Sequence, residues 1–430
     1  MSRKIQLSPF LKIVFSTPDK KSIFFGYYNY SPISRDGMKV LAHRSRFEGR
    51  MPTANDQVEI GYYHLVENEW YPVAESKAFN WQQGTMLQWL GPDYNNKFIY
   101  NDAEDNRFVS HIIDIENKNI KTVPHPIYGV DPKGEFSISL KFERCYWTRA
   151  YNYFSVIDEK WKQNIPSGDG IFKVNLKTGK IQRIISIQDI VELSGGSDTF
   201  QHWFEHIMLN PTGNRFAFYH RYGSINEFHT IPYTADIYGK NIWQHPLKNG
   251  DRFSHLGWKD ETSYVIFTIP ENKRINAWKK YKYANDRKRS MIELYRRYVK
   301  PLIPRKITKS IINPKSHYAL TEDQNGIIEV MDSPLLKRDG HPSFTKNGRF
   351  MLTDTYENEK GYRDLLLYDL YKKRVVILGT FYSTYNSCGW RADLHPRFSY
   401  DERFIIIDSS HNGHHQMIVL QLDWEKVKKK

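Results

Sequence analysis

Cysteine is scarce in this chain of 430 residues, which contains only Cys145 and Cys388. Without a CxxC or similar spacing, two distant cysteines exclude a disulfide framework and a cysteine zinc site. The sequence also lacks any run of about 18 apolar residues, so we expect no membrane-spanning helix. Pro9 and Lys12 interrupt the N-terminal stretch, which makes it a poor signal peptide. We therefore expect a soluble cytoplasmic protein.

Aromatic residues, by contrast, are abundant. Phe, Trp and Tyr make up 15% of the chain, and 40% of all residues are hydrophobic. A disordered or low-complexity protein does not carry this many aromatic side chains. The sequence therefore predicts a folded protein with a sizeable core.

Positive charge is concentrated in one segment. Residues 273–315 contain 15 lysines and arginines and only two acids, and this net +13 accounts for nearly all of the formal charge of +14. The chain is thus a near-neutral body that carries one basic segment. No motif that reads nucleic acid accompanies the charge, so we expect no nucleic-acid partner.

An internal repeat organises the chain. Residues 339–354 and 393–408 align without a gap, and each is typical of a short strand, a tight turn and a second apolar strand. A third strand is expected after each, at residues 365–369 and 417–421. The same template recurs five times earlier in the sequence, within residues 30–42, 88–102, 127–139, 206–219 and 255–268.

Seven copies predict the architecture. When the basic insertion is left out, each copy occupies roughly 50 residues, which is the size of a propeller blade of four strands. We predict an all-β fold in which the whole chain, residues 1–430, forms a single seven-bladed β-propeller domain. The alternatives are a β-sandwich or two smaller sheets.

The basic insertion is expected between blades 5 and 6. Its apolar residues near 278, 281, 292, 295 and 299 have helical spacing and end before Pro301. One interpretation is a solvated helix packed on the rim of the propeller. The other is an interfacial helix that contacts anionic lipid or an anionic polymer.

Histidines recur at one position of the repeat. Three residues before the bulky apolar residue of the first strand, copies four to seven carry His206, His255, His341 and His395. Innermost strands line the channel of a propeller, so the four imidazoles should converge at one mouth. Imidazoles suit Mn, Fe, Zn or Ni, which predicts a metal or anion site. Inheritance of the repeat without any site is the alternative.

A second repeated position, at the end of the second strand, also carries polar groups. It holds His43, Arg44, Asp102, His220, Arg221, Asp354 and Asp408. Arginines can bind carboxylates in a bidentate manner, so we expect Arg44 and Arg391 to bind an acidic substrate. The acids that precede two of the repeated histidines, Asp339 and Asp393, either orient the imidazoles or cap turns.

The strings DGHPSFTKNGRFMLTDT and DLHPRFSYDERFIIIDSSHNGHHQMIVLQL resemble the WD40-like repeat of TolB-type propellers. Their His-Pro openings more narrowly resemble oligogalacturonate lyases, which are seven-bladed propellers. The resemblance implies a divalent metal, typically Mn²⁺, on His255, His341 and His395, with His206 as a fourth ligand or substrate contact. The sequence departs from that family just before His395, where Arg391 and Asp393 stand instead of a glutamine.

Two functions follow from these observations. The first is a metal-dependent polysaccharide lyase that cleaves a uronate-containing carbohydrate by β-elimination, with His220 or Arg221 transferring the proton. The second is a non-catalytic propeller scaffold in the assembly of bacterial surface polysaccharide. In that case residues 273–315 would dock the cytoplasmic protein on the anionic surface of the inner membrane.

Overall fold

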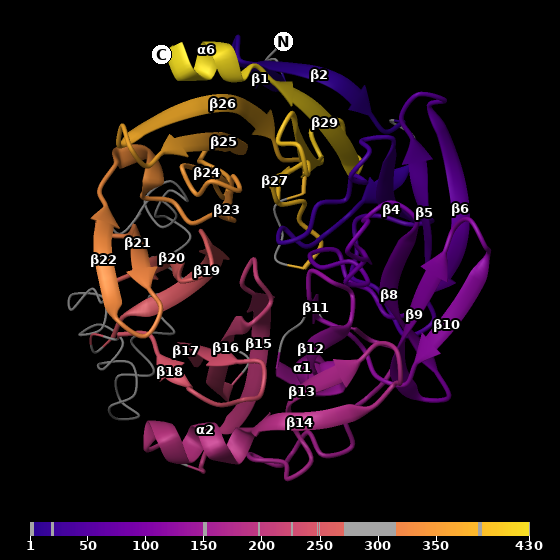
Figure 1. Cartoon of the computed structure of the whole chain (residues 1–430), viewed down its shortest axis with the longest axis vertical. Helices are drawn as coiled ribbons and strands as arrows, with labels where there is room; N and C mark the ends of the chain where they lie inside the picture. Colours follow the sequence, from indigo (N-terminus) through magenta and orange to yellow (C-terminus); the bar gives the residue numbers. More distant parts are fainter. Residues whose placement is uncertain are drawn as a thin grey trace, which may run out of the picture.

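A computed structural model of the chain describes residues 4–429, with the exception of residues 19–20, 149–152, 197, 225–226, 247, 249, 271–314 and 386–388. Seven antiparallel sheets stand around a central channel like the blades of a propeller (Figure 1). This arrangement confirms the predicted all-β, seven-bladed fold.

In the first three blades the strands follow one another from the channel outward. The first blade consists of β3 (Ser22–Phe24), β4 (Lys39–Ser45), β5 (Val58–His64) and β6 (Glu69–Ser76). The second consists of β7 (Gln88–Trp89), β8 (Lys97–Glu104), β9 (Arg107–Asp114) and β10 (Asn119–Val123). The third consists of β11 (Gly129–Val130), β12 (Phe136–Leu140), β13 (Gly170–Asn175) and β14 (Ile181–Ser186).

The next two blades have the same order. The fourth consists of β15 (Gln201–Leu209), β16 (Arg215–Ser224), β17 (Glu227–Asp236) and β18 (Trp243–Gln244). The fifth consists of β19 (Arg252–Trp258), β20 (Ser263–Ile269), β21 (His317–Glu322) and β22 (Gly326–Met331).

The last two blades are completed by the N-terminus. The sixth contains β23 (Ser343–Phe344), β24 (Phe350–Asp354), β25 (Tyr362–Asp369) and β26 (Arg374–Tyr382), and β1 (Ile5–Leu7) pairs with the outer edge of β26. The seventh contains β27 (Arg397–Phe398), β28 (Phe404–Ser409) and β29 (Gln416–Leu422), and its outermost strand is β2 (Leu11–Ser16). Pairing of β2 with β29, from the two ends of the chain, therefore closes the ring.

Helices are few and short in the described residues. They are α1 (Phe142–Thr148), α2 (Ile187–Ser194), the 3-10 helix η3 (Pro334–Leu336) and α6 (Trp424–Lys429). A capping box from Ser186 starts α2, and Gly195 ends it in the left-handed conformation. Among the described residues, no helix is both long and apolar enough to cross a bilayer.

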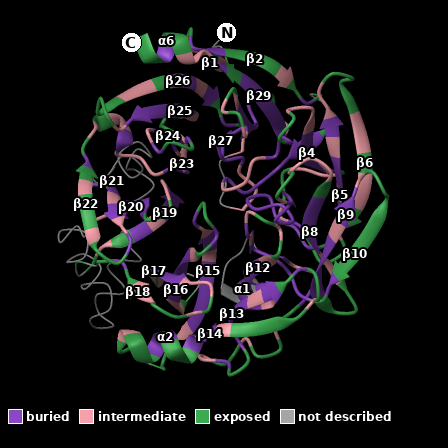
Figure 2. Ribbon diagram, in the orientation of Figure 1, coloured by how far each residue is buried: buried purple, intermediate pink, exposed green. Residues whose placement is uncertain are grey.

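The core lies between the blades. Second strands such as β24, with every residue buried, and β20 are apolar on both faces because each blade packs against its two neighbours (Figure 2). Outer strands such as β10 are mostly exposed. Hydrophobic burial of this kind is the main favourable contribution to folding.

The position predicted for the basic insertion was wrong. The chain leaves β20 at Ile269 and returns at His317 in β21, and Thr268 pairs with His317 within the fifth blade. The segment therefore interrupts blade 5 itself, between its second and third strands, and does not join blades 5 and 6. The sequence pattern could not show this, because the third strand of copy five lies beyond the insertion. The helix predicted within the basic insertion, over about residues 278–299, falls outside the described residues, which resume at Lys315.

Candidate metal-binding site at the channel mouth

The backbone at the repeated histidine position is unusual. His206 and His395 have positive φ angles of 57° and 43°, and Met86, which occupies the matching place in the second blade, has 55°. In β15 and β19 the register shifts across His206 and His255, so that each of these strands bulges there. A bulge re-aims a side chain relative to the regular strand. This position thus has an irregular backbone in blades 2, 4, 5 and 7, three of which carry a histidine there.

The structure brings all four histidines to one pocket. The ring centroids of His255 and His341 are 4.1 Å apart, those of His341 and His395 are also 4.1 Å apart, and His206 stands 6.0 Å from His255. The pocket has a volume of about 30 Å³ and is lined by Tyr27, Tyr28, Gln82, Gln83, His206, His255, His341, Arg391 and His395. Three imidazoles therefore form a compact group, and His206 stands to one side.

The three clustered imidazoles are oriented through their Nδ1 atoms. The Nδ1 atom of His255 lies 3.0 Å from Oδ1 of Asp339, and that of His341 lies 2.8 Å from Oδ1 of Asp354. The Nδ1 atom of His395 lies 2.5 Å from the carbonyl oxygen of Gly26, which can only accept a hydrogen bond. If Nδ1 carries the proton in each ring, Nε2 keeps its lone pair. Hydrogen bonding of this kind is how proteins prepare histidines for a metal.

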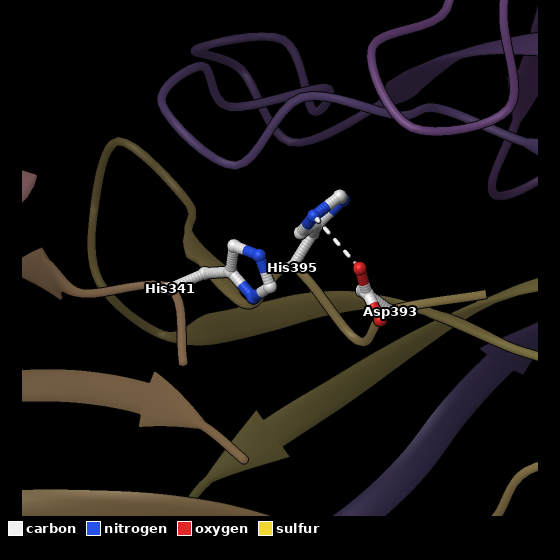
Figure 3. A group of neighbouring side chains, drawn as sticks. All are labelled: His341, Asp393 and His395. Carbon is white, nitrogen blue, oxygen red and sulfur yellow. Dashed lines mark ion pairs between the residues drawn. The ribbon is translucent and has the colours of Figure 1, made fainter. Parts of the chain in front are cut away.

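Asp393 is buried beside the cluster. His341, Asp393 and His395 each offer one ligand atom, and these atoms lie within 4.8 Å of one another (Figure 3). Asp393 also accepts hydrogen bonds from the guanidinium groups of Arg363 and Arg391, the latter at 2.7 Å. Burial alone would raise the pKa of Asp393, but Arg391 and Arg363 lower it far below its usual value. Asp393 is therefore an ionised carboxylate in contact with two cations.

The protonation of the cluster fits a metal. Burial lowers the pKa of His341 and His395 well below 6.5, and the neighbouring imidazoles lower it further. Metals bind the neutral form of imidazole, so these rings need not lose a proton at neutral pH. Neutral nitrogens next to a buried carboxylate are a donor set that Mn²⁺, Fe²⁺ and Zn²⁺ accept. The residues present thus fit a divalent cation.

Four lining residues come from loops that the sequence analysis did not assign to the site. Tyr27 and Tyr28 follow β3, and Gln82 and Gln83 precede β7. The ring of Tyr28 lies 5.1 Å from that of His341, and Nε2 of Gln82 donates to the carbonyl of Arg391 at 2.5 Å. The sequence shows no glutamine just before His395, but in the structure the amide of Gln82 reaches the pocket from another blade.

Glycines allow these two loops to meet. Gly26 and Gly84 have φ angles of +102° and +58°, and a Cβ atom on Gly26 would overlap the backbone of Gln83 and Gly84. Asp408 accepts the backbone N–H groups of Phe25 and Gly26 at 3.0 and 3.1 Å, which holds the first loop in place. In the sequence, Gly26 stands directly before the two tyrosines and Gly84 directly after the two glutamines. A glycine allows another backbone to approach closely, so these two positions could have indicated the contact between the loops.

His220 and Arg221 are not brought to this pocket. His220 is buried in blade 4, where its Nε2 lies 2.9 Å from Nδ1 of His202, and burial lowers its pKa to about 3. Arg221 is buried in an ion pair with Glu205 and lies against the ring of Phe228. These contacts hold both side chains within the blade, although Nδ1 of His220 and Nε of Arg221 are buried without a hydrogen-bond partner among the described residues. Their role in proton transfer stays a prediction that this placement does not favour.

The two arginines predicted to bind substrate are separated. Arg391 lines the histidine pocket, with its Nε atom held by Asp393. Arg44 lies elsewhere, paired with Glu59 and stacked 5.3 Å from the ring of Trp70, in a second pocket. Arg391 is therefore the arginine that the structure places beside the histidines.

Comparison with known proteins agrees with the fold. No protein-family model matches this chain, and no curated protein sequence matches it. Among solved structures, it is similar to an oligogalacturonate lyase in complex with manganese, at 15% identity and a TM-score of 0.64, over 97% of this chain and 95% of that one. It is also similar to an oligogalacturonate lyase from Vibrio parahaemolyticus, at 12% identity and a TM-score of 0.59, over 97% and 96% of the two chains. The chain thus has the seven-bladed propeller fold of oligogalacturonate lyases.

Proposed function

We propose that this protein is a metal-dependent lyase that cleaves a uronate-containing glycan by β-elimination. The observation that carries the proposal is the group of three imidazoles, each with Nδ1 at an acceptor, beside Asp393 and Arg391 in one pocket. The shared fold with a lyase that binds manganese supports it. The substrate would be an acidic carbohydrate.

A divalent metal such as Mn²⁺ would be held by His255, His341 and His395, with Asp393 or the amide of Gln82 next to them, and would supply positive charge beside the uronate carboxylate. Arg391 would pair with the same carboxylate, because its guanidinium lines the pocket. The salt bridge from Nε to Asp393 fixes the plane of that guanidinium before substrate arrives.

Elimination requires a base for the C5 proton. As that proton leaves, a double bond forms between C4 and C5, the C4–O4 bond breaks, and the leaving oxygen takes up a proton. Burial raises the pKa of Tyr27 and Tyr28 well above 10, so both phenols stay protonated and cannot act as the base. His206 lines the same pocket but stands apart from the other three rings. We assign proton abstraction to His206 for this reason.

Ultraviolet absorbance tests the proposal directly, since β-elimination creates a double bond conjugated to the carboxylate. The protein, loaded with Mn²⁺, is incubated with a panel of oligouronates of different sugar composition. We expect absorbance to rise with at least one of them, and to stay flat with the His341→Ala variant. If the metal is bound and no oligouronate gives a rise, the lyase proposal fails and the non-catalytic scaffold becomes the better account.

A further inference from the structure

A second pocket opens near the first. It has a volume of about 600 Å³ and is lined by Lys21, Ser22, Arg44, Ser45, Arg46, Phe47, Glu48, Glu59 and His414. The histidine pocket, at about 30 Å³, is much smaller. None of the residues of the second pocket takes part in the metal site described above.

Both pockets lie at the same face of the propeller. Ser22 and Ser45 are paired, so the start of β3 and the end of β4 meet at this face of the first blade. In the seventh blade, Asp408 at the end of β28 hydrogen-bonds to the carbonyl of Leu394, next to His395. The connection that follows β28 carries His414. The metal-site histidines and the second pocket therefore open toward the same side of the ring.

A stacked aromatic pair lies next in sequence to lining residues of both pockets. Gln82 belongs to the histidine pocket, and the neighbouring residue, Trp81, stacks on His415 with ring centroids 4.6 Å apart and planes at 5°. The residue before His415 is His414, which lines the second pocket and pairs with Glu48 at 2.7 Å. Trp81 and His415 are themselves buried, so this stack is a short wall of packed side chains between neighbouring pockets.

The lining of the second pocket suits sugar units. Arg44 is paired with Glu59, and His414 with Glu48, so hydrogen-bond donors and acceptors stand side by side, as sugar hydroxyls require. Phe47 adds a half-buried apolar ring, one face of which is covered by the guanidinium of Arg50 at 3.8 Å from the ring centroid. Lys21 and Arg46 are exposed and positively charged, and Arg46 is paired with Glu75 at 2.9 Å, a surface pair that a substrate carboxylate would have to share. The pocket thus offers both hydroxyl and carboxylate contacts.

We infer that the second pocket binds sugar units of the same acidic glycan beyond the bond that is cleaved. This inference rests on the proposed function. The protein would select oligomers that reach both pockets over shorter fragments. Linking two binding events makes the second one intramolecular, which raises affinity without any new contact.

Calorimetric titration of the Mn²⁺-loaded His206→Ala variant, which keeps the metal but lacks the proposed base, measures the inference with oligogalacturonates of two to six units. We expect Kd to fall by about tenfold or more from the shortest to the longest oligomer. The double variant Lys21→Ala, Arg46→Ala should lose this dependence on length. The matched control Arg107→Ala, Lys133→Ala removes the same charge from exposed positions outside both pockets, and should keep it.

The outcomes separate the two proposals. If Kd does not change with length, or if the double variant keeps the full dependence on length, the second pocket is not a sugar site and the inference is overturned. If binding depends on length but no oligouronate gives an absorbance rise with Mn²⁺ present, the lyase proposal fails while the second binding site stands.

Discussion

Oδ1 of Asp354 accepts two hydrogen bonds from His341, one from its backbone N–H and one from its Nδ1, both at 2.8 Å. The other oxygen, Oδ2, accepts the backbone N–H of His395 at 3.2 Å. A single buried carboxylate at the end of β24 therefore positions histidines of two consecutive blades. Asp408, at the same place in the next blade, similarly holds the backbone of Phe25 and Gly26.

Asp354→Asn should weaken binding of Mn²⁺ by about 10- to 100-fold. The asparagine amide has one acceptor oxygen, and its NH₂ group can only donate, so at least one of these three N–H groups loses its acceptor. Isothermal titration calorimetry measures the change. The control is Asp369→Asn, which removes a carboxylate that pairs with Arg349 outside the site. Equal affinity in the two variants would show that Asp354 does not orient the metal ligands.

Replacement of both His341 and His395 by Ala should abolish binding of divalent metal, since it removes two neighbouring nitrogens of the cluster. In the wild-type protein, Mn²⁺ at 100 times its Kd should stabilise the folded state by about 2.7 kcal/mol. Thermal denaturation with and without Mn²⁺ measures this, and circular dichroism checks that the double variant is folded. A metal-induced increase in Tm that survives in the double variant would contradict the site.

Gly84→Ala should destabilise the protein and disturb the pocket. The new Cβ atom would overlap the imidazole of His43 and the carbonyl of Phe25, in addition to the cost of a positive φ. Gly37→Ala is the matched control, because Gly37 also has positive φ (+77°) but open space around its Cβ position. We expect Gly84→Ala to lose about 2 kcal/mol more than Gly37→Ala in urea denaturation. Equal losses would show that the loop can shift freely.

The free energy of unfolding should fall in mild acid. Uptake of one proton by His245 on unfolding should account for part of this pH dependence. Burial lowers the pKa of His245 to about 4, whereas an unfolded histidine titrates near 6.5. Between these values the unfolded chain binds the proton and the folded protein does not, so stability decreases as pH falls from 6.5 to 4.

His245→Gln, whose amide can replace the hydrogen bond to the hydroxyl of Tyr264, removes this titration. Its unfolding free energy should depend on pH less steeply than that of the wild type, by about 1.4 kcal/mol per pH unit between 4.5 and 6. Denaturant unfolding at several pH values measures both slopes. Parallel slopes would show that His245 is protonated in the folded state.

Deletion of residues 271–314 should leave the propeller intact. Thr268 and His317 pair across the hairpin, so Ile269, Pro270, Lys315 and Ser316 would remain to form a four-residue turn, a common hairpin length. We expect the deletion protein to keep the strand signal and cooperative unfolding of the full chain. Loss of folding would mean that the segment stabilises blade 5.

The full chain should sediment with anionic liposomes at low salt and be released at high salt, because lysines and arginines near such a surface contribute roughly 1 kcal/mol each. The deletion protein should stay in the supernatant. Sedimentation of both proteins to the same extent would exclude the basic segment as a membrane-binding element.

Periodicity in the sequence determined the blades. A strand–turn–strand unit such as residues 339–354 depends on contacts between near neighbours, so its pattern can be read locally. The same alignment predicted that His206, His255, His341 and His395 share one structural position, and the structure brings their rings to one pocket. Seven repeats of one unit were enough to predict the ring.

Contacts between distant segments were decided only by the tertiary structure. Gln82 reaches Arg391 across 309 positions of the chain, and His395 bonds to Gly26 across 369. His220 shares its sequence setting with His43, yet its Nε2 atom contacts His202 on a neighbouring strand of its own blade and not the pocket. The blade that holds the basic insertion was decided by the pairing of β20 with β21. Such contacts depend on how the ring closes, because closure places segments from opposite ends of the chain side by side, and local sequence patterns carry no information about that pairing.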